Sequence, residues 1–134
     1  MAPRTASQVL IARRYLERGF LDTAMRLMVR NAASVEAGDW AFLVERLMER
    51  GRIVDVVQVC ALGGVELPRE QLLAIGDTRL RARDFDGAKL LYEIADADTP
   101  RWEHFVDVLT SLPGQERLAL QLAERHLVSL ARAS

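Results

Sequence analysis

A fixed internal period is the feature of this sequence that most restricts its fold. The step that separates Gly19 from Gly51 also separates Pro68 from Pro100. Small and apolar residues repeat at this step at Ala24, Val56, Ala88 and Leu120, at Ile11, Leu43 and Ile75, and, with one misfit, at Tyr15, Leu47 and Arg79. A fixed period in this range indicates stacked helical hairpins, because one hairpin alone cannot bury its apolar face.

The hydrophobic pattern predicts helices and no strands. Apolar residues recur at helical spacing along almost the whole chain, and no segment alternates strictly. Gly19 and Gly51 each follow an arginine, as is usual where a helix ends, whereas Pro68 and Pro100 are tolerated in a first helical turn. We therefore expect eight helices, near 5–18, 21–33, 39–50, 53–62, 68–82, 85–96, 100–111 and 115–131.

These helices predict an all-α superhelix of about four stacked helix-turn-helix hairpins. The hairpins would form a short right-handed array within a single domain, 1–134, with units at about 5–35, 37–66, 68–98 and 100–131. A chain of 134 residues is long enough to bury one continuous core in this way.

Residues at fixed places in these units resemble the tetratricopeptide repeat. That repeat opens on an aromatic–x–x–Leu–Gly–x–x–Tyr pattern, continues with an alanine and closes on a proline. The matching residues are Ile11, Ala12, Tyr15 and Ala24 in the first unit; Trp40, Leu43 and Pro68 in the second; Ile75, Gly76, Ala88, Tyr92, Ala95 and Pro100 in the third; and Trp102, Phe105 and Leu109 in the fourth. The period is about two residues shorter than the usual 34, and Pro113-Gly114 disturbs the last unit. The chain therefore resembles a divergent member of the tetratricopeptide family.

Composition argues against several classes of partner and compartment. The formal net charge of −1 predicts no bulk attraction to nucleic acid or anionic lipid. Cys60 is the sole cysteine, which excludes an internal disulfide and fits a reducing compartment, so we expect a cytoplasmic protein. The first helix lacks the apolar stretch of a signal peptide, and the apolar segment 53–62 is interrupted and too short to insert into a membrane.

No residue pattern predicts catalysis, a cofactor or a metal site. His104 and His126 have no neighbours at metal-ligand spacing, and we interpret them as surface or packing residues. Cys60 is interpreted as a buried, inert thiol, and Gly63-Gly64 as a turn. The acidic residues at the turns are interpreted as helix caps; these are Asp84, Asp86, Asp96 and Asp98. The sequence thus predicts a protein that is not an enzyme.

The resemblance implies a groove that binds a protein or peptide. In tetratricopeptide arrays the first helix of each unit lines a concave surface, which would place there Val9, Arg13, Leu16, Glu45, Met48, Leu73, Asp77, Leu80, Trp102, Phe105 and Leu109. An apolar strip of this kind suits an apolar or amphipathic helix, with Trp102 and Phe105 as anchors. We expect an adaptor, a scaffold or a small chaperone like some tetratricopeptide-like proteins of bacterial secretion systems. The alternative for each apolar groove residue is a place in the core.

Two other functions stay open at this stage. The segment 115–131 has more leucine and valine than one core-facing stripe requires, which is compatible with a self-assembling structural protein that forms homo-oligomers through this helix. A pentatricopeptide-like array that binds RNA is a remote alternative. It is disfavoured because Arg13, Glu45 and Asp77 share one register and would present two acids to a phosphate backbone.

Overall fold

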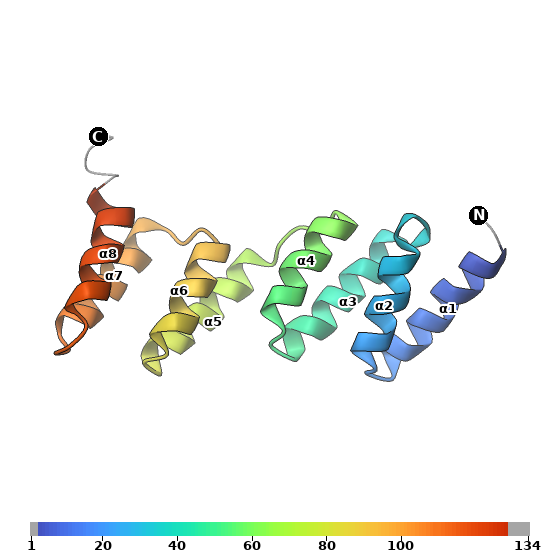
Figure 1. Cartoon of the computed structure of the whole chain (residues 1–134), viewed down its shortest axis with the longest axis horizontal. Helices are drawn as coiled ribbons and strands as arrows, with labels where there is room; N and C mark the ends of the chain where they lie inside the picture. The colour runs from blue at the N-terminus through green and yellow to red at the C-terminus, as the bar shows by residue number, and fades with distance from the viewer. Residues whose placement is uncertain (1–2, 129–134) are drawn as a thin grey trace. The chain divides into compact units, whose positions relative to one another are not determined.

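The computed structural model describes the backbone of residues 3–128 and the side chains of residues 6–127. Within this part of the chain there are eight α-helices and no strand (Figure 1). The helices are α1 (Pro3–Glu17), α2 (Leu21–Arg30), α3 (Ala37–Glu49), α4 (Ile53–Gly63), α5 (Arg69–Arg81), α6 (Phe85–Ile94), α7 (Thr99–Thr110) and α8 (Glu116–Ala123). A short 3-10 helix (Ala32–Ser34) follows α2, and a π-helical turn (Glu124–Val128) extends α8. The all-α prediction is confirmed; residues 129–131 of the predicted last helix lie outside the described part.

Consecutive helices pair as hairpins, α1 with α2, α3 with α4, α5 with α6 and α7 with α8. The turn inside each hairpin contains one residue with left-handed backbone: Gly19 (φ 85°), Gly51 (φ 68°), Arg83 (φ 61°) and Gly114 (φ 87°). The first three follow one another at the period of the sequence. Arg83 adopts the left-handed conformation for which the two preceding hairpins use glycine. The repeat of the sequence is thus a repeat of the turn.

The eight helices divide into two compact units, residues 1–67 and 68–134, each made of two hairpins. The boundary coincides with Pro68, which was expected to open the third hairpin. That all four hairpins form a single right-handed array in one domain stays a prediction. Among residues 3–128, no helix is both long and apolar enough to cross a membrane.

The first unit has a continuous core between its two hairpins. In α3, the tetratricopeptide-like positions Trp40, Leu43 and Leu47 are buried. They form one apolar cluster with α1, α2 and α4, which contribute Ala12, Leu16, Leu21, Ala24, Met28, Val56, Val59 and Cys60. The residues Leu43 and Leu47 are therefore the means by which α3 stacks on the preceding hairpin.

Polar contacts also join the two hairpins of the first unit. Arg13 of α1 forms a bidentate pair with Asp39 of α3, with both nitrogen–oxygen distances at 2.9 Å. The guanidinium of Arg50 donates a hydrogen bond of 3.1 Å to the carbonyl oxygen of Gly19. These contacts fix the register between the hairpins, while burial of the apolar cluster supplies most of the stabilisation.

In the second unit, aromatic side chains connect the hairpins. The ring centroid of Tyr92 on α6 lies 5.5 Å from Trp102 and 5.9 Å from Phe105, both on α7. Phe105 also lies 6.1 Å from Phe85, at the start of α6. Gly76 of α5 lies beneath Tyr92, where a β-carbon would approach the ring to 2.6 Å. The glycine of the tetratricopeptide-like pattern thus makes room for the tyrosine of the following helix.

The last hairpin is out of step with the period of the sequence. The period places Leu120 with the buried Ala24, Val56 and Ala88, but Leu120 is 61% exposed, and this placement was wrong. The buried pair in α8 is Ala119 and Leu122, which follow Ala88 and Leu91 by one position less than a full period. The turn residue is displaced by the same one position, since Gly114 follows Arg83 by one position less than a full period. The shortening therefore lies between Arg83 and Gly114, and not in the step from this turn to α8.

Candidate protein-interaction surface

The apolar residues predicted to line an open groove belong to the core instead. Seven of them are buried: Val9, Leu16, Leu73, Leu80, Trp102, Phe105 and Leu109. Met48 is half-buried and packs against the core of the first unit. Trp102 and Phe105, the expected anchors, contact Tyr92 of the preceding hairpin. The prediction of an exposed apolar strip along these residues is corrected, because their side chains are buried or half-buried.

The charged residues of the predicted groove keep contact with solvent. Arg13 and Glu45 are exposed, and Asp77 is half-buried. Arg13 pairs with Asp39, and Asp77 pairs with Arg101, so in each unit a charge on the first helix binds an opposite charge on the third. The two pairs have opposite polarity. Their geometry fixes hairpin stacking within each unit.

A polar pocket of about 410 Å³ surrounds Asp77 in the second unit. The Arg101 guanidinium donates to both carboxylate oxygens of Asp77, at 3.1 and 3.2 Å, and to Asp98 at 2.9 Å. The Tyr92 hydroxyl donates to the same Asp77 carboxylate. Arg81, His104, Leu80 and Pro100 complete the lining.

The charges of this pocket bind one another. Burial alone would raise the pKa of Asp77, but hydrogen bonds from Arg101 and Tyr92 outweigh it and lower that pKa. Burial and the Asp77 carboxylate raise the pKa of Tyr92, so its hydroxyl stays protonated and continues to donate. Asp77, Arg101 and Asp98 therefore form a satisfied network that positions α5 against α7.

Other residues considered for chemistry occupy packing or turn positions. Cys60 is buried, and burial raises the pKa of its thiol. The His126 ring stacks on Trp102 with a centroid distance of 3.7 Å, which confirms it as a packing residue. Asp84 caps α6 by accepting from the Gly87 amide, whereas Asp98 precedes α7 without a side-chain cap and binds Arg101 instead. Within the described residues, no three His, Cys, Asp or Glu side chains are grouped to hold a metal.

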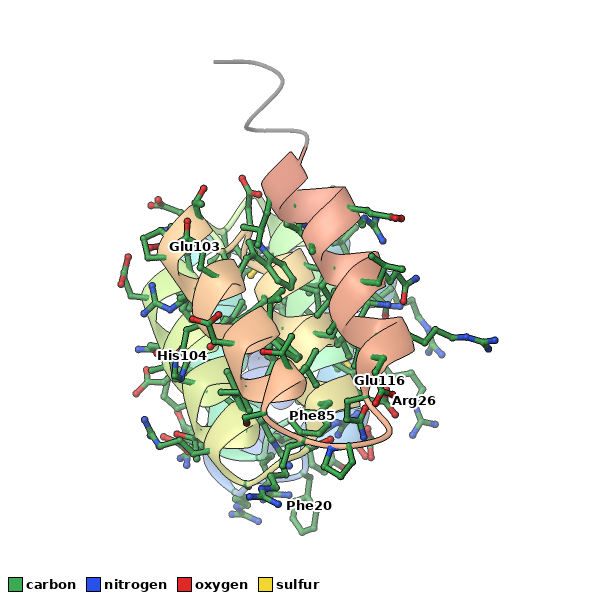
Figure 2. The ribbon with its side chains drawn as sticks, turned by 90° about the vertical axis from the view of Figure 1, so that its left-hand side faces the viewer. Phe20, Arg26, Phe85, Glu103, His104 and Glu116 are labelled. Atoms are coloured by element: carbon green, nitrogen blue, oxygen red, sulfur yellow. The ribbon has the colours of Figure 1, made fainter. Side chains whose placement is uncertain are left out.

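An apolar groove of about 350 Å³ runs between α7 and α8. We call it the end groove; it is lined by Val106, Thr110, Leu112, Glu116, Ala119, Leu120 and Ala123. Figure 2 looks onto these two helices and shows Glu116 at the start of α8. None of these residues was among the predicted groove residues, but four of them lie in the segment 115–131 that the sequence offered as a homo-oligomer surface: Glu116, Ala119, Leu120 and Ala123.

The repeat explains why the end groove has this shape. Phe105 of α7 packs on the hairpin that precedes it, against Phe85 and Tyr92 of α6. At the shortened step of the last hairpin, the counterparts of Phe85 and Tyr92 in α8 are Glu116 and Ala123, and both line the end groove. We call the position on α6 that Phe105 fills a seat. The end groove is the corresponding seat on the last hairpin, and no described side chain occupies it.

A second exposed apolar surface lies on the first hairpin. We call it the leading surface; it comprises Ile11, Tyr15 and Phe20, all exposed. The rings of Tyr15 and Phe20 meet edge to face, 6.1 Å apart. Ile11 and Tyr15 share a register with the buried Leu43 and Leu47, so the period did not predict their exposure.

Comparisons with protein-family models, curated proteins and solved structures find no match to this chain.

Proposed function

We propose that this protein is a divergent tetratricopeptide-like interaction module that binds the apolar ridge of a partner helix in the end groove. It would act as an adaptor or scaffold and not as a catalyst. The observation that carries the proposal is the register of the end groove. Its residues Glu116 and Ala123 hold the places in α8 that Phe85 and Tyr92 hold in α6, where these two rings contact Phe105 of α7.

The composition of the end groove suits such a helix. Leu120 is exposed and Val106 and Leu112 are half-buried, so a partner would remove apolar surface from water at each of them. Full burial of a large apolar side chain stabilises by roughly 1.5–3 kcal/mol. Ala119 and Ala123 leave room for a bulky side chain between the helices. Glu116 at the rim favours a partner that carries a cation beside its apolar ridge.

A peptide copy of residues 98–112 tests this function, because its Trp102, Phe105 and Leu109 form the ridge whose seat is known. We expect the unlabelled peptide, added to ¹⁵N-labelled protein, to shift amide NMR signals of α7 and α8 selectively. The protein variant Leu120→Asp should bind the peptide at least tenfold more weakly, since it places a charge in the groove. A peptide with Phe105→Asp should not bind.

The control is Leu90→Asp, the same change at an exposed leucine on α6, outside the end groove. It should bind the peptide like the unsubstituted protein. Circular dichroism would establish that both variants remain helical. Binding that is unchanged in Leu120→Asp, or shifts spread over α1–α6, would show that the end groove is not the seat.

A further inference from the structure

The leading surface is the same ridge that stacks hairpins elsewhere in the chain. Ile11 precedes Leu43 by one full period, and Phe105 follows Trp102 as Leu43 follows Trp40, so the three hold one place in their helices. Leu43 and Phe105 are fully buried against the hairpin before them, whereas Ile11 is 47% exposed. Helix α1 therefore presents an uncovered stacking ridge.

The next position of the ridge shows the same contrast. Tyr15 precedes Leu47 by one full period, and Leu109 follows Trp102 as Leu47 follows Trp40. It is 38% exposed, while both of its counterparts are buried. Two successive ridge positions of α1 thus lack the cover that α3 and α7 receive.

The leading surface and the end groove are complementary by register. Phe105 fills the seat formed by Phe85 and Tyr92, and the end groove is the next such seat. Ile11 holds the place of Phe105 in α1. A ridge and a seat of the same repeat thus stand unpaired on the two terminal hairpins of the described chain.

A polar contact inside the first unit has its counterpart in these two surfaces. Arg50 donates to the carbonyl of Gly19 across the hairpins of that unit. Arg18 precedes Arg50 by one full period and is exposed. Gly114 adopts the left-handed turn of Gly19, with φ of 87° against 85°. Docking of α1 on the end groove in the same way would bring Arg18 to the carbonyl of Gly114.

Charge also matches across the two surfaces. Arg14 and Arg18 flank the leading surface, and both are exposed. Glu116 lines the end groove, and the exposed Asp107 follows the lining residue Val106 in sequence. Opposite charges around two apolar patches favour one orientation of docking over others.

We propose that the end groove receives the leading surface of a second copy of this chain. This inference rests on the proposed function of the end groove and names its partner. The contact joins two different surfaces, so each copy keeps one free seat and one free ridge. Such head-to-tail contacts extend into filaments or close into rings.

Two single-surface variants test the inference by complementation. Ile11→Asp disables the leading surface and Leu120→Asp disables the end groove, and both residues are exposed, so neither change affects the core. Each variant alone lacks one half of every contact and should sediment as a monomer. An equimolar mixture keeps one intact ridge and one intact groove, and should form a dimer and nothing larger. Leu90→Asp is the matched control and should assemble like the unsubstituted chain, whose average mass should rise with concentration.

Analytical ultracentrifugation over a hundredfold concentration range gives the result. The inference is overturned if the unsubstituted chain stays monomeric or if the mixture yields no dimer. It is also overturned if Ile11→Asp assembles to the same extent as the unsubstituted chain. The peptide titration separates this failure from failure of the proposed function. Peptide binding in the end groove together with a monomeric protein removes the second copy as partner and leaves the function standing, whereas absence of peptide binding removes the function.

Discussion

Arg83 occupies a backbone conformation that the first two hairpins fill with glycine. Its φ is 61°, and Gly51, one repeat earlier, has φ of 68°. A residue with a β-carbon is strained there by roughly 1–2 kcal/mol. Glycine removes this strain, but its greater conformational freedom in the unfolded chain offsets part of the gain in stability. We expect Arg83→Gly to raise the free energy of unfolding by about 0.5–1 kcal/mol, and Gly51→Ala to lower it by about 1 kcal/mol. A β-carbon at Gly51 meets no atom within 4 Å, so urea titration of the two variants isolates the backbone effect.

His126 makes stability depend on pH. Its ring stacks on Trp102, its Nε2 atom is buried without a hydrogen-bond partner, and burial lowers its pKa from 6.5. The unfolded chain then binds the proton more readily than the folded one, so the His126 contribution is fully present above pH 6.5 and is lost as the pH falls through the lowered folded pKa. We expect the thermal midpoint to fall between pH 7.5 and 5.5, and to fall less in His126→Phe, which keeps the stack. Circular dichroism measures the thermal midpoint at each pH. Equal dependence of the midpoint on pH in both proteins would contradict this role.

At the scale of the helix, the same repeat position has opposite consequences in α1 and α3. Leu43 is fully buried and Ile11, its counterpart, is 47% exposed. Leu43→Asp should unfold the first unit or cost more than about 3 kcal/mol, because it buries a charge without a partner. Ile11→Asp should change stability by less than about 0.5 kcal/mol, as is usual for surface substitutions. Urea denaturation at low protein concentration compares them; a large loss in Ile11→Asp would mean that α1 is packed on both sides.

At the scale of the whole molecule, the two units provide separate spectroscopic probes. Trp40 lies in the core of the first unit and Trp102 in that of the second. Every member of the first unit's apolar cluster comes from residues 1–67. We expect Leu47→Ala to shift the unfolding transition reported by Trp40, by about 2–5 kcal/mol, and to shift that reported by Trp102 less.

The measurement uses fluorescence of Leu47→Ala in two backgrounds, Trp102→Phe for the first unit and Trp40→Phe for the second. Phe105→Ala is the reciprocal variant and should act mainly on the Trp102 signal. Coincident transitions that shift equally would show that the chain unfolds as one cooperative domain, as the sequence predicted.

The sequence by itself determined the eight helices, the turns between them and the stacking unit. Glycine, proline and apolar spacing act locally, so Gly19, Gly51 and Pro68 mark the ends of helices independently of tertiary contacts. Hydrophobic spacing also shows which face of a helix is apolar. It does not show what covers that face: Phe105 and Ile11 occupy one register, and only packing distinguishes the buried residue from the exposed one.

The end groove depended on tertiary structure for a second reason. The chain has one residue fewer between Arg83 and Gly114 than a full period, so Ala119 and not Leu120 holds the buried position. One residue corresponds to about 100° around a helix, which is why the period alone assigned the wrong face. A periodic pattern averages over such an offset, whereas side-chain packing responds to each residue. The sequence therefore determined that hairpins repeat, and the tertiary structure decided where the last seat stays open, because burial depends on the neighbour that a helix face meets in space.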